Sequence, residues 1–500
     1  MFDSRRRRRV LYNDDSDQQY VRMPGAPKTK YVQQQPAFKY MVPDAQAFID
    51  ARTTPVFDTH VDTYVWCLGN GSDPAWGGTR PFAAGMKSNQ EATDLIVEAC
   101  HARGLEVWGS LRMNDIHDAV RATSLEAADD PMKARHPDWL LRPPGSKELP
   151  ESFSEHYQWT AFNFERSEVR EYRLAFIEKS ASHHDFDGYE LDFTRFEWYL
   201  PLGTERQKAH IMTGLVRQVR SRLNAIGRSR GRPITLAVHV FDSPGAALNL
   251  GLDVENWVDD GLVDVLVVGA GYRHYSLRLG EWLDLAEPYS VPVYPSVNTN
   301  TYLDWVPTLG NRIHTAALRA VASHYWQEGA DGIYLFNHFS QVGFRELGSG
   351  DSLEIHEIYD QLSEVGDPAV LRGKDKLYGI GAPSEQAMHQ QATLDAPLPV
   401  PLDSTERVLP IKMGADATDT RADSRIRAWT TGGNEGESVW FRLNHVLLDA
   451  TRSGAWIDAP VPHGVFRTGD NVLGVWCDRD LVEVTDPTII HRLFIEVSYG

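Results

Sequence analysis

Two acidic residues spaced two apart are the strongest sign of chemistry in the sequence. Glu190 and Asp192 lie in the strand-like segment of residues 187–193, and the period of two of a β-strand turns both carboxyl groups to one face. Burying two acids side by side is costly unless they are paired, hydrogen-bonded or functional. Glu190 could pair with Arg112 or Arg195 and only stabilise the fold, whereas the strand-end position of Asp192 favours function.

Cleavage of a glycosidic bond needs such a pair of acids. One carboxylate must be ionised to attack or stabilise the anomeric carbon, and one carboxyl group must be protonated to assist the leaving oxygen. Neighbouring acids raise one pKa and leave the other low. The pair therefore favours glycoside hydrolysis, with Asp192 as nucleophile or charge stabiliser. A protein that binds carbohydrate without cleaving it is an alternative.

A second group of residues indicates a metal-dependent hydrolase. His60-Val-Asp62 resembles the H-x-D motif of barrel metallohydrolases, and Glu190, His239 and His274 could complete a ligand set. Imidazole and carboxylate suit zinc or a similar metal that activates water. Because the chain has 18 histidines, a match of this size arises easily by chance. We therefore rank this reading second and expect no catalytic metal and no other cofactor.

The elements that must position these residues alternate between strand and helix. Eight segments have the β-branched and aromatic content of strands, and helix-type segments separate most of them. Their count and alternation predict an α/β fold, a (β/α)8 TIM barrel. A doubly wound sheet would need a glycine-rich phosphate loop after its first strand, which the sequence lacks. The expected strands are residues 55–64, 105–113, 159–164, 187–193, 234–241, 263–269, 291–297 and 331–337.

In such a barrel the active site forms at the C-terminal ends of the strands. We expect its catalytic carboxyl groups to come from Asp192, Glu190, Asp242 and Glu197. Hydrogen-bonding and aromatic side chains at the other strand ends suit a carbohydrate substrate. The expected substrate-binding residues are Asp58, His60, Arg112, Asn163, Arg195, Trp198, His239, Tyr272, Asn298, Asn337 and His338.

Two motifs resemble the family-10-like glycosyl hydrolase domains, barrels related to the α-galactosidase and α-amylase assemblage. Residues 186–196 (FDGYELDFTRF) are similar to their "DG-x-x-x-D-x-x-R" strand, and residues 162–172 (FNFERSEVREY) are similar to their third strand and helix. The resemblance spans roughly residues 50–375 and implies a glycosidase in which Asp192 is the nucleophile. The partner acid is less fixed in position in that assemblage, which leaves Asp242 and Glu197 as rivals.

Shifts in composition divide the chain into four expected regions. The C-terminal region has short alternating strands, typical of an antiparallel β-sandwich, and resembles the jelly-roll domains attached to many glycosidases. Such domains bind carbohydrate or buttress the barrel, and the lack of an evident aromatic row favours the buttress. The regions are an irregular N-terminal arm (1–50), the barrel (51–380), a linker (381–402) and the β-sandwich (403–500).

Composition and charge exclude several classes of protein. The 500 residues include 50 Lys and Arg against 69 Asp and Glu, which disfavours nucleic acid or an anionic membrane surface as partner. The three cysteines form no C-x-x-C pair and cannot build a disulfide framework. No apolar segment follows the run Arg5–Arg9, so we expect a cytoplasmic protein, with export of a disulfide-free protein as the alternative. The arginines suit a solvated tail or an arm that joins copies in a homo-oligomer.

Overall fold

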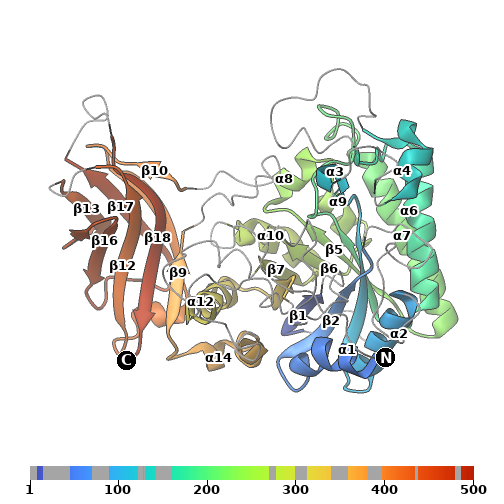
Figure 1. Ribbon diagram of the computed structural model, residues 1–500, viewed down its shortest axis with the longest axis horizontal. Helices are drawn as coiled ribbons and strands as arrows, with labels where there is room; N and C mark the ends of the chain where they lie inside the picture. The colour runs from blue at the N-terminus through green and yellow to red at the C-terminus, as the bar shows by residue number, and fades with distance from the viewer. Residues whose placement is uncertain are drawn as a thin grey trace, which may run out of the picture.

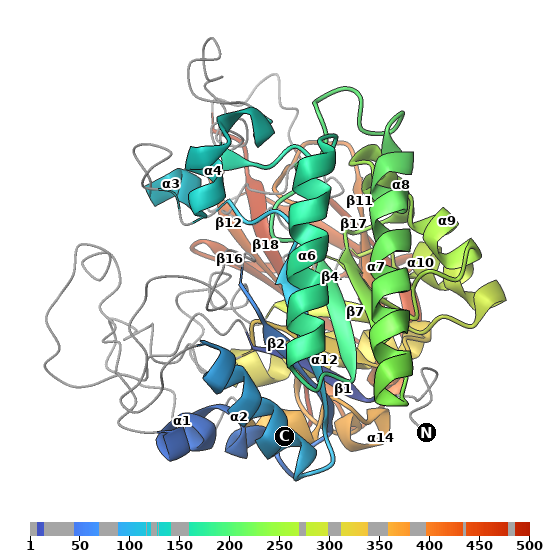
Figure 2. The same cartoon turned by 90° about the vertical axis from the view of Figure 1, so that its right-hand side faces the viewer.

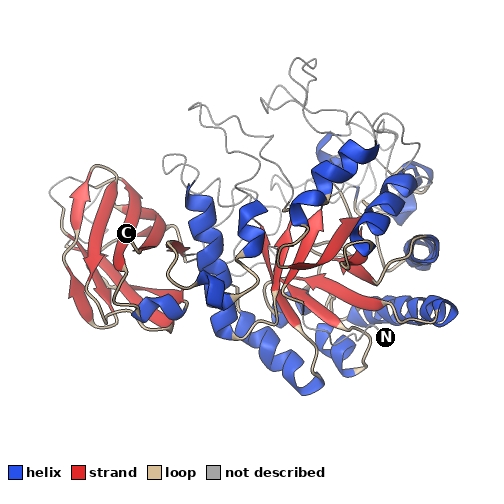
Figure 3. Cartoon of the chain, turned by 90° about the horizontal axis from the view of Figure 1, so that it is seen from below, coloured by secondary structure: helices blue, strands red, loops and turns tan. Residues whose placement is uncertain are grey.

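The protein forms two bodies, a barrel and a β-sandwich, in a computed structural model (Figure 1). Figure 3 shows the barrel strands surrounded by helices and the sandwich beside them. The structure describes residues 8–14, 45–69, 89–116, 118–121, 128, 130–141, 160–269, 277–298, 312–338, 359–380, 397–433, 437–478 and 486–500.

Eight parallel strands close into a barrel, in the chain order β1 to β8. The last strand pairs back with the first, where Tyr334 lies opposite Leu11, so the sheet has no free edge. The prediction of a (β/α)8 barrel is confirmed. The strands are β1 (Val10–Asp14), β2 (Val61–Cys67), β3 (Glu106–Arg112), β4 (Gly188–Asp192), β5 (Thr235–Val240), β6 (Val265–Val268), β7 (Val293–Asn298) and β8 (Ile333–Phe336).

The first barrel strand comes from the region that the sequence predicts to be an irregular arm. All of Val10–Asp14 is buried, and it pairs with β2 on one side and β8 on the other. The prediction that residues 1–50 lie outside the barrel is therefore wrong at β1. A strand of five residues directly after a run of arginines has little local signature, because its identity depends on the two strands that it joins.

The segment 159–164, expected to be the third strand, does not belong to the barrel. Within the described residues of this region, its only strand-like pairing is a single antiparallel bridge between Leu140 and Phe162. The expected first strand, 55–64, contributes only its last residues to β2, which begins at Val61. The two errors cancel in the count, so the acidic segment 187–193 is still the fourth strand, β4.

Helices cover the outside of the barrel. Figure 2 shows α6 and α7 side by side along the barrel wall. Gly231, with φ 74°, ends α7 in a left-handed conformation that glycine adopts readily. No helix in the described ranges is both long enough and apolar enough to cross a membrane. The helices are α1 (Ala45–Arg52), α2 (Asn89–His101), α3 (Asp118–Arg121), α4 (Pro131–Arg135), α6 (Ser167–His183), α7 (Ala209–Arg230), α8 (Pro244–Asn249), α9 (Val254–Asp259), α10 (Leu279–Ala286), α12 (Arg312–Glu328) and α14 (Pro368–Leu371), with 3-10 turns η2 (Thr54–Val56), η4 (Pro137–Trp139), η6 (Glu287–Tyr289), η8 (Gln361–Ser363) and η10 (Ala415–Thr418).

Two antiparallel sheets form the C-terminal sandwich, as the alternating segments predict. One sheet has the order β10-β18-β12-β16-β15, with β9 also paired to β18, and the other has the order β11-β17-β13-β14. The strands are β9 (Lys376–Gly379), β10 (Val400–Pro401), β11 (Arg407–Met413), β12 (Asp423–Thr431), β13 (Val439–Leu443), β14 (Val446–Leu448), β15 (Thr451–Ser453), β16 (Trp456–Val461), β17 (Gly469–Cys477) and β18 (Ile489–Ser498).

The boundary between the two bodies lies earlier than the sequence predicts. Strand β9 belongs to the sandwich sheet, because its residues pair with β18, although the prediction assigned residues up to 380 to the barrel. Residues 381–396 of the expected linker lie outside the described residues, and its end carries β10, which also pairs with β18. Helix α12 joins the bodies: Ala320 packs in the sandwich core, and Glu328 forms an ion pair of 2.7 Å with Lys412.

Candidate active site

Strand β4 places its two acids in successive layers of the barrel interior. Asp192, the last residue of the strand, lies opposite Arg112 at the end of β3 and His239 on β5. Glu190 lies one layer deeper, opposite Ser110. The alternation of the strand therefore turns both acids inward, with Asp192 at the mouth of the barrel and Glu190 beneath it.

Glu190 is sealed in the barrel interior. Its Oε1 accepts hydrogen bonds from Ser110 Oγ at 2.6 Å and from Tyr334 Oη at 3.0 Å, while Oε2 has no hydrogen-bond partner among the described residues. Burial, and after it the charge of Asp192, raises the pKa of Glu190 to about 8. The carboxyl group is therefore protonated at neutral pH, and it is too deep to meet a substrate directly.

Asp192 is held by the turn that follows β4. Its Oδ1 accepts hydrogen bonds from the backbone N–H and the hydroxyl of Thr194, both at 2.8 Å. Within the described part of the chain, every hydrogen bond to this carboxylate goes to Oδ1. The side chain is almost wholly buried. One oxygen is thus fixed by the protein, and no described residue hydrogen-bonds to the other.

His239 borders the same carboxylate in a defined tautomer. Its Nε2 lies 2.8 Å from the carbonyl oxygen of Gly269, which can only accept, so Nε2 carries the proton. Burial lowers the pKa of His239, against the opposing charge of Asp192. The unprotonated Nδ1 of the neutral ring lies 3.7 Å from Asp192 Oδ1. Because this nitrogen carries no proton, it donates no hydrogen bond to Oδ1, and Thr194 remains the donor.

Two guanidinium groups flank the mouth of the barrel. Arg112 Nη1 donates to Asp115 Oδ2 at 2.7 Å, and Arg195 lies with its Cζ 5.1 Å from the centre of the Phe336 ring. Burial, and after it the charge of Arg195, lowers the pKa of Arg112. The charge of Arg195 thus acts on Arg112, and an anionic group near both would offset it.

Glu197 lies in the turn after β4. Its charge and the charge of Asp192 both act on the phenol of Tyr199. Burial raises the pKa of Tyr199 well above its usual range, and the charges of Asp192 and Glu197 raise it further. The hydroxyl of Tyr199 donates to the carbonyl oxygen of Phe196 at 2.7 Å.

The remaining expected residues within the described ranges are spread around the strand ends. Asp242 follows β5 and is buried beside Gly269, where a Cβ would come within 3.8 Å of its Oδ1. Asn337 and His338 follow β8 and are also buried, with the Asn337 N–H bonded to Asn13 Oδ1 at 3.1 Å. These residues lie at the C-terminal end of the barrel, as predicted.

Two of the expected substrate-binding residues make local contacts. Asn163 Oδ1 accepts a hydrogen bond of 3.0 Å from the Glu165 N–H in the turn that leads into α6. Trp198 is buried in a small apolar cluster with Ile116 and Phe196, and its ring stacks on Phe196. In the described ranges no hydrogen bond links either side chain to Asp192.

The prediction that Asp58, His60 and Asp62 lie at a C-terminal strand end is wrong. They precede or begin β2, at the opposite end of the barrel. Asp58 is exposed at φ 60°, and Asp62 accepts hydrogen bonds from the backbone and guanidinium of Arg9. The expected metal ligands therefore do not meet. His60 and Asp62 lie at the start of β2, whereas Glu190 and His239 lie toward the ends of their strands.

Three expected residues cannot be placed. Tyr272 and His274 lie outside the described residues, and so does the side chain of Asn298, whose backbone ends β7. Sequence reasoning missed Thr194, which orients Asp192, and assigned no role to Asp115, which pairs with Arg112. Both follow a strand end by two or three positions, where polar side chains commonly hydrogen-bond to the strand terminus, and this spacing could have identified them.

Replacing Glu190 by glutamine is expected to remove a pH dependence of stability. The folded-state pKa of about 8 exceeds the ordinary value of 4.5, so the folded protein retains a proton that the unfolded chain releases between these values. Stability is then complete below about pH 4.5 and falls as the pH rises to about 8, by up to about 1.4 kcal/mol per pH unit. Urea midpoints of wild type and Glu190→Gln at pH 5, 6, 7 and 8 measure this.

The matched control for this prediction is Glu171→Gln, the same change at an exposed position on α6. Its urea midpoints should follow those of the wild type at every pH. Parallel pH profiles for wild type and Glu190→Gln would contradict the buried, protonated state of Glu190.

Comparison with known proteins finds similarity only at the level of structure. Neither a protein-family model nor a curated protein matches the chain. The endo-β-1,4-mannanase of Thermotoga petrophila is similar with a TM-score of 0.43 and 10% identity, over 88% of this chain and 93% of the mannanase. An α-amylase of Malbranchea cinnamomea has a TM-score of 0.41 and 11% identity, over 93% and 96%.

Other similar structures are larger. A cycloisomaltooligosaccharide glucanotransferase of Paenibacillus sp. has a TM-score of 0.35 and 9% identity over 100% of this chain, which spans 58% of the glucanotransferase. The chain spans 49% of an α-L-fucosidase of Paenibacillus thiaminolyticus. These proteins are carbohydrate-active enzymes by name, but similarity this distant does not identify the reaction of this chain. The resemblance to family-10-like domains remains a prediction.

Proposed function

We propose that the protein is a glycoside hydrolase in which Asp192 is the nucleophile or the charge stabiliser. The observation that carries the proposal is the state of its carboxylate at the barrel mouth: Thr194 orients Oδ1, and no described residue hydrogen-bonds to Oδ2. An oriented anion of this kind can attack or stabilise a positively charged anomeric carbon. Protonated Glu190 beneath it adds no second negative charge at neutral pH, and its hydrogen bonds go to Ser110 and Tyr334.

The second carboxyl group is drawn from Glu197 and Asp242. Glu197 is favoured because it follows Asp192 in the turn after β4, and the charges of both acids act on Tyr199. Asp242 is equally buried but lies after β5, beside Gly269. Both groups are buried near the C-terminal ends of the strands, and a general acid must carry a proton that it can give to the leaving oxygen.

The reaction is tested by a screen of aryl glycosides and of neutral, uronate-containing and sulfated polysaccharides, with release of reducing sugar as the readout. We include anionic glycans because Arg112 and Arg195 flank the mouth. Hydrolysis that a chelator does not affect supports the proposal, and hydrolysis abolished by a chelator would favour a metallohydrolase. Binding of glycans without any hydrolysis would favour a carbohydrate-binding barrel and overturn it.

A further inference from the structure

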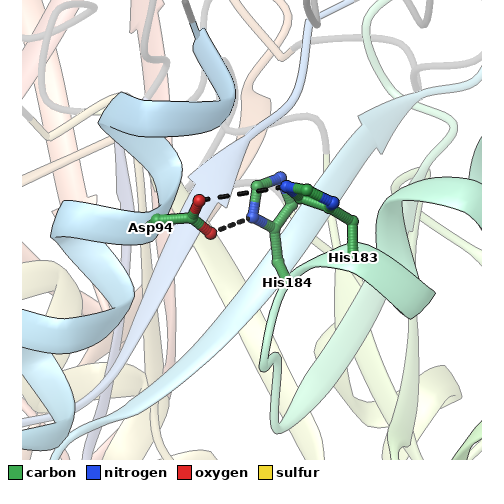
Figure 4. A group of neighbouring side chains, drawn as sticks. All are labelled: Asp94, His183 and His184. Atoms are coloured by element: carbon green, nitrogen blue, oxygen red, sulfur yellow. Dashed lines mark hydrogen bonds and ion pairs between the residues drawn. The ribbon is translucent and has the colours of Figure 1, made fainter. Parts of the chain in front are cut away.

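Three side chains of the types that commonly bind metal ions meet on the outside of the barrel, away from the candidate active site. Figure 4 shows the imidazole rings of His183 and His184 beside the carboxylate of Asp94. Asp94 Oδ1 lies 2.6 Å from His184 Nδ1, and Asp94 Oδ2 lies 3.9 Å from His183 Nε2. In the described ranges this is the one group of three such residues whose ligand atoms all lie within 4.8 Å of one another.

The fold holds one member of the group rigidly and leaves the others adjustable. The His184 ring is fully buried, with its centre 5.2 Å from that of Phe186, and Arg230 Nη2 donates to the His184 carbonyl oxygen at 2.5 Å. Asp94 and His183 have about half of their side-chain surface exposed, 55% and 47%. Asp94 and His183 could therefore move toward the fixed imidazole of His184 when a ligand binds, without disturbing the core.

Helix α6 ends between the two histidines. His183 is the last helical residue, and His184 has extended backbone angles, φ −93° and ψ 149°. The change of backbone direction sets the two rings nearly perpendicular, at 88°, with centres 4.7 Å apart. Consecutive residues can thus both face Asp94, which comes from the neighbouring helix α2.

We propose that Asp94, His183 and His184 bind Zn²⁺ or a similar divalent transition metal. Two imidazoles and a carboxylate are ligands that zinc accepts, whereas calcium and magnesium prefer oxygen alone. Tetrahedral Zn²⁺ with ligands at about 2.0–2.1 Å needs ligand atoms roughly 3.3 Å apart, a spacing between the two distances observed here.

The metal would stabilise the fold and take no part in the proposed hydrolysis. The two histidines lie before the N-terminal end of β4, and Asp192 is the last residue of that strand. A bound ion would tie α2 to the end of α6, two elements that are far apart in the sequence. Binding should therefore raise the unfolding temperature and leave turnover unchanged, so this inference can fail while the proposed function holds, and the reverse.

The test uses the full chain without a polyhistidine tag. We expect calorimetric titration with ZnCl₂ to give one site, and Co²⁺ to give the visible absorption bands of a tetrahedral complex. Asp94→Asn and His183→Asn should each lower the Zn²⁺ affinity about tenfold or more, since loss of even an outer-shell partner has effects of that size. His210→Asn, at an exposed histidine on α7, is the matched control and should bind as the wild type does.

Both test positions are exposed, so the variants should fold, and circular dichroism checks this. The increase in unfolding temperature with Zn²⁺ should disappear in Asp94→Asn and persist in His210→Asn. Wild-type affinity in both Asp94→Asn and His183→Asn would overturn the proposal, and so would a lack of Zn²⁺ binding by the wild type at micromolar concentrations. In either case the pair of Asp94 and His184 is an ordinary hydrogen bond.

Discussion

Replacing Asp192 by asparagine is expected to reduce turnover about 10³-fold or more on any glycoside that the wild type hydrolyses. The substitution keeps the size of the side chain and an oxygen for Thr194 to bond, but it removes the negative charge at the mouth of the barrel. An oxocarbenium-like transition state then loses its nearest anion. Initial rates on the best substrate from the screen measure the effect, with KM determined separately to separate binding from chemistry.

The matched control for Asp192→Asn is Asp62→Asn, the same change at the opposite end of the barrel. Asp62 pairs with Arg9 there, so its variant should keep wild-type turnover. Loss of activity in Asp62→Asn and near wild-type turnover in Asp192→Asn would together contradict the site proposed here. Thermal unfolding of both variants verifies that any lost activity is not lost folding.

The same substrates distinguish the two candidate acids. A variant that lacks the general acid should be least impaired on aryl glycosides whose leaving group needs no proton. We expect that pattern for Glu197→Gln and little change for Asp242→Asn. The reverse pattern would assign the acid to Asp242. The separation of the two carboxyl groups in a complex with a sugar then gives the stereochemistry: about 5–5.5 Å for retention, about 6.5–9.5 Å for inversion.

Replacing Glu106 by glutamine is expected to destabilise the barrel by about 3–5 kcal/mol, because it removes a negative charge that is bonded to a buried guanidinium. Arg8 Nε donates to Glu106 Oε2 at 2.6 Å, and both side chains have only 1% of their surface exposed. The Arg8 guanidinium also lies over the Trp108 ring, 5.0 Å from its centre. These contacts hold the residue that leads into β1, the strand that closes the barrel.

The neighbouring pair gives an internal control for this prediction. Arg9 and Asp62 are also bonded, at 2.9 Å, but Arg9 is 45% exposed, and exposed ion pairs contribute only about 0–1 kcal/mol. Urea unfolding followed by tryptophan fluorescence should therefore show a large decrease in midpoint for Glu106→Gln and a small one for Asp62→Asn. Equal small decreases would mean that β1 is not held by the buried pair.

The wrong bounds predicted for β2 explain why Asp58, His60 and Asp62 are misplaced. The segment before β2 reads as a complete strand, so Asp58, His60 and Asp62 were expected at its end, although the strand itself runs from Val61 to Cys67. A displacement of a few residues along a barrel strand moves a side chain from one end of the barrel to the other. This error does not affect the acids of β4, because Asp192 is the last residue of its strand and a polar turn follows it.

The sequence by itself determined the barrel class, the sandwich and the common face of Glu190 and Asp192, because alternation and periodicity are local properties that each segment carries. Only the tertiary structure decided which strands close the barrel, how deeply Glu190 is buried beneath Asp192, and that His183 and His184 meet Asp94. The physical reason is that closure, depth and contacts between helices depend on pairings across long stretches of chain. No single segment contains the information for such pairings.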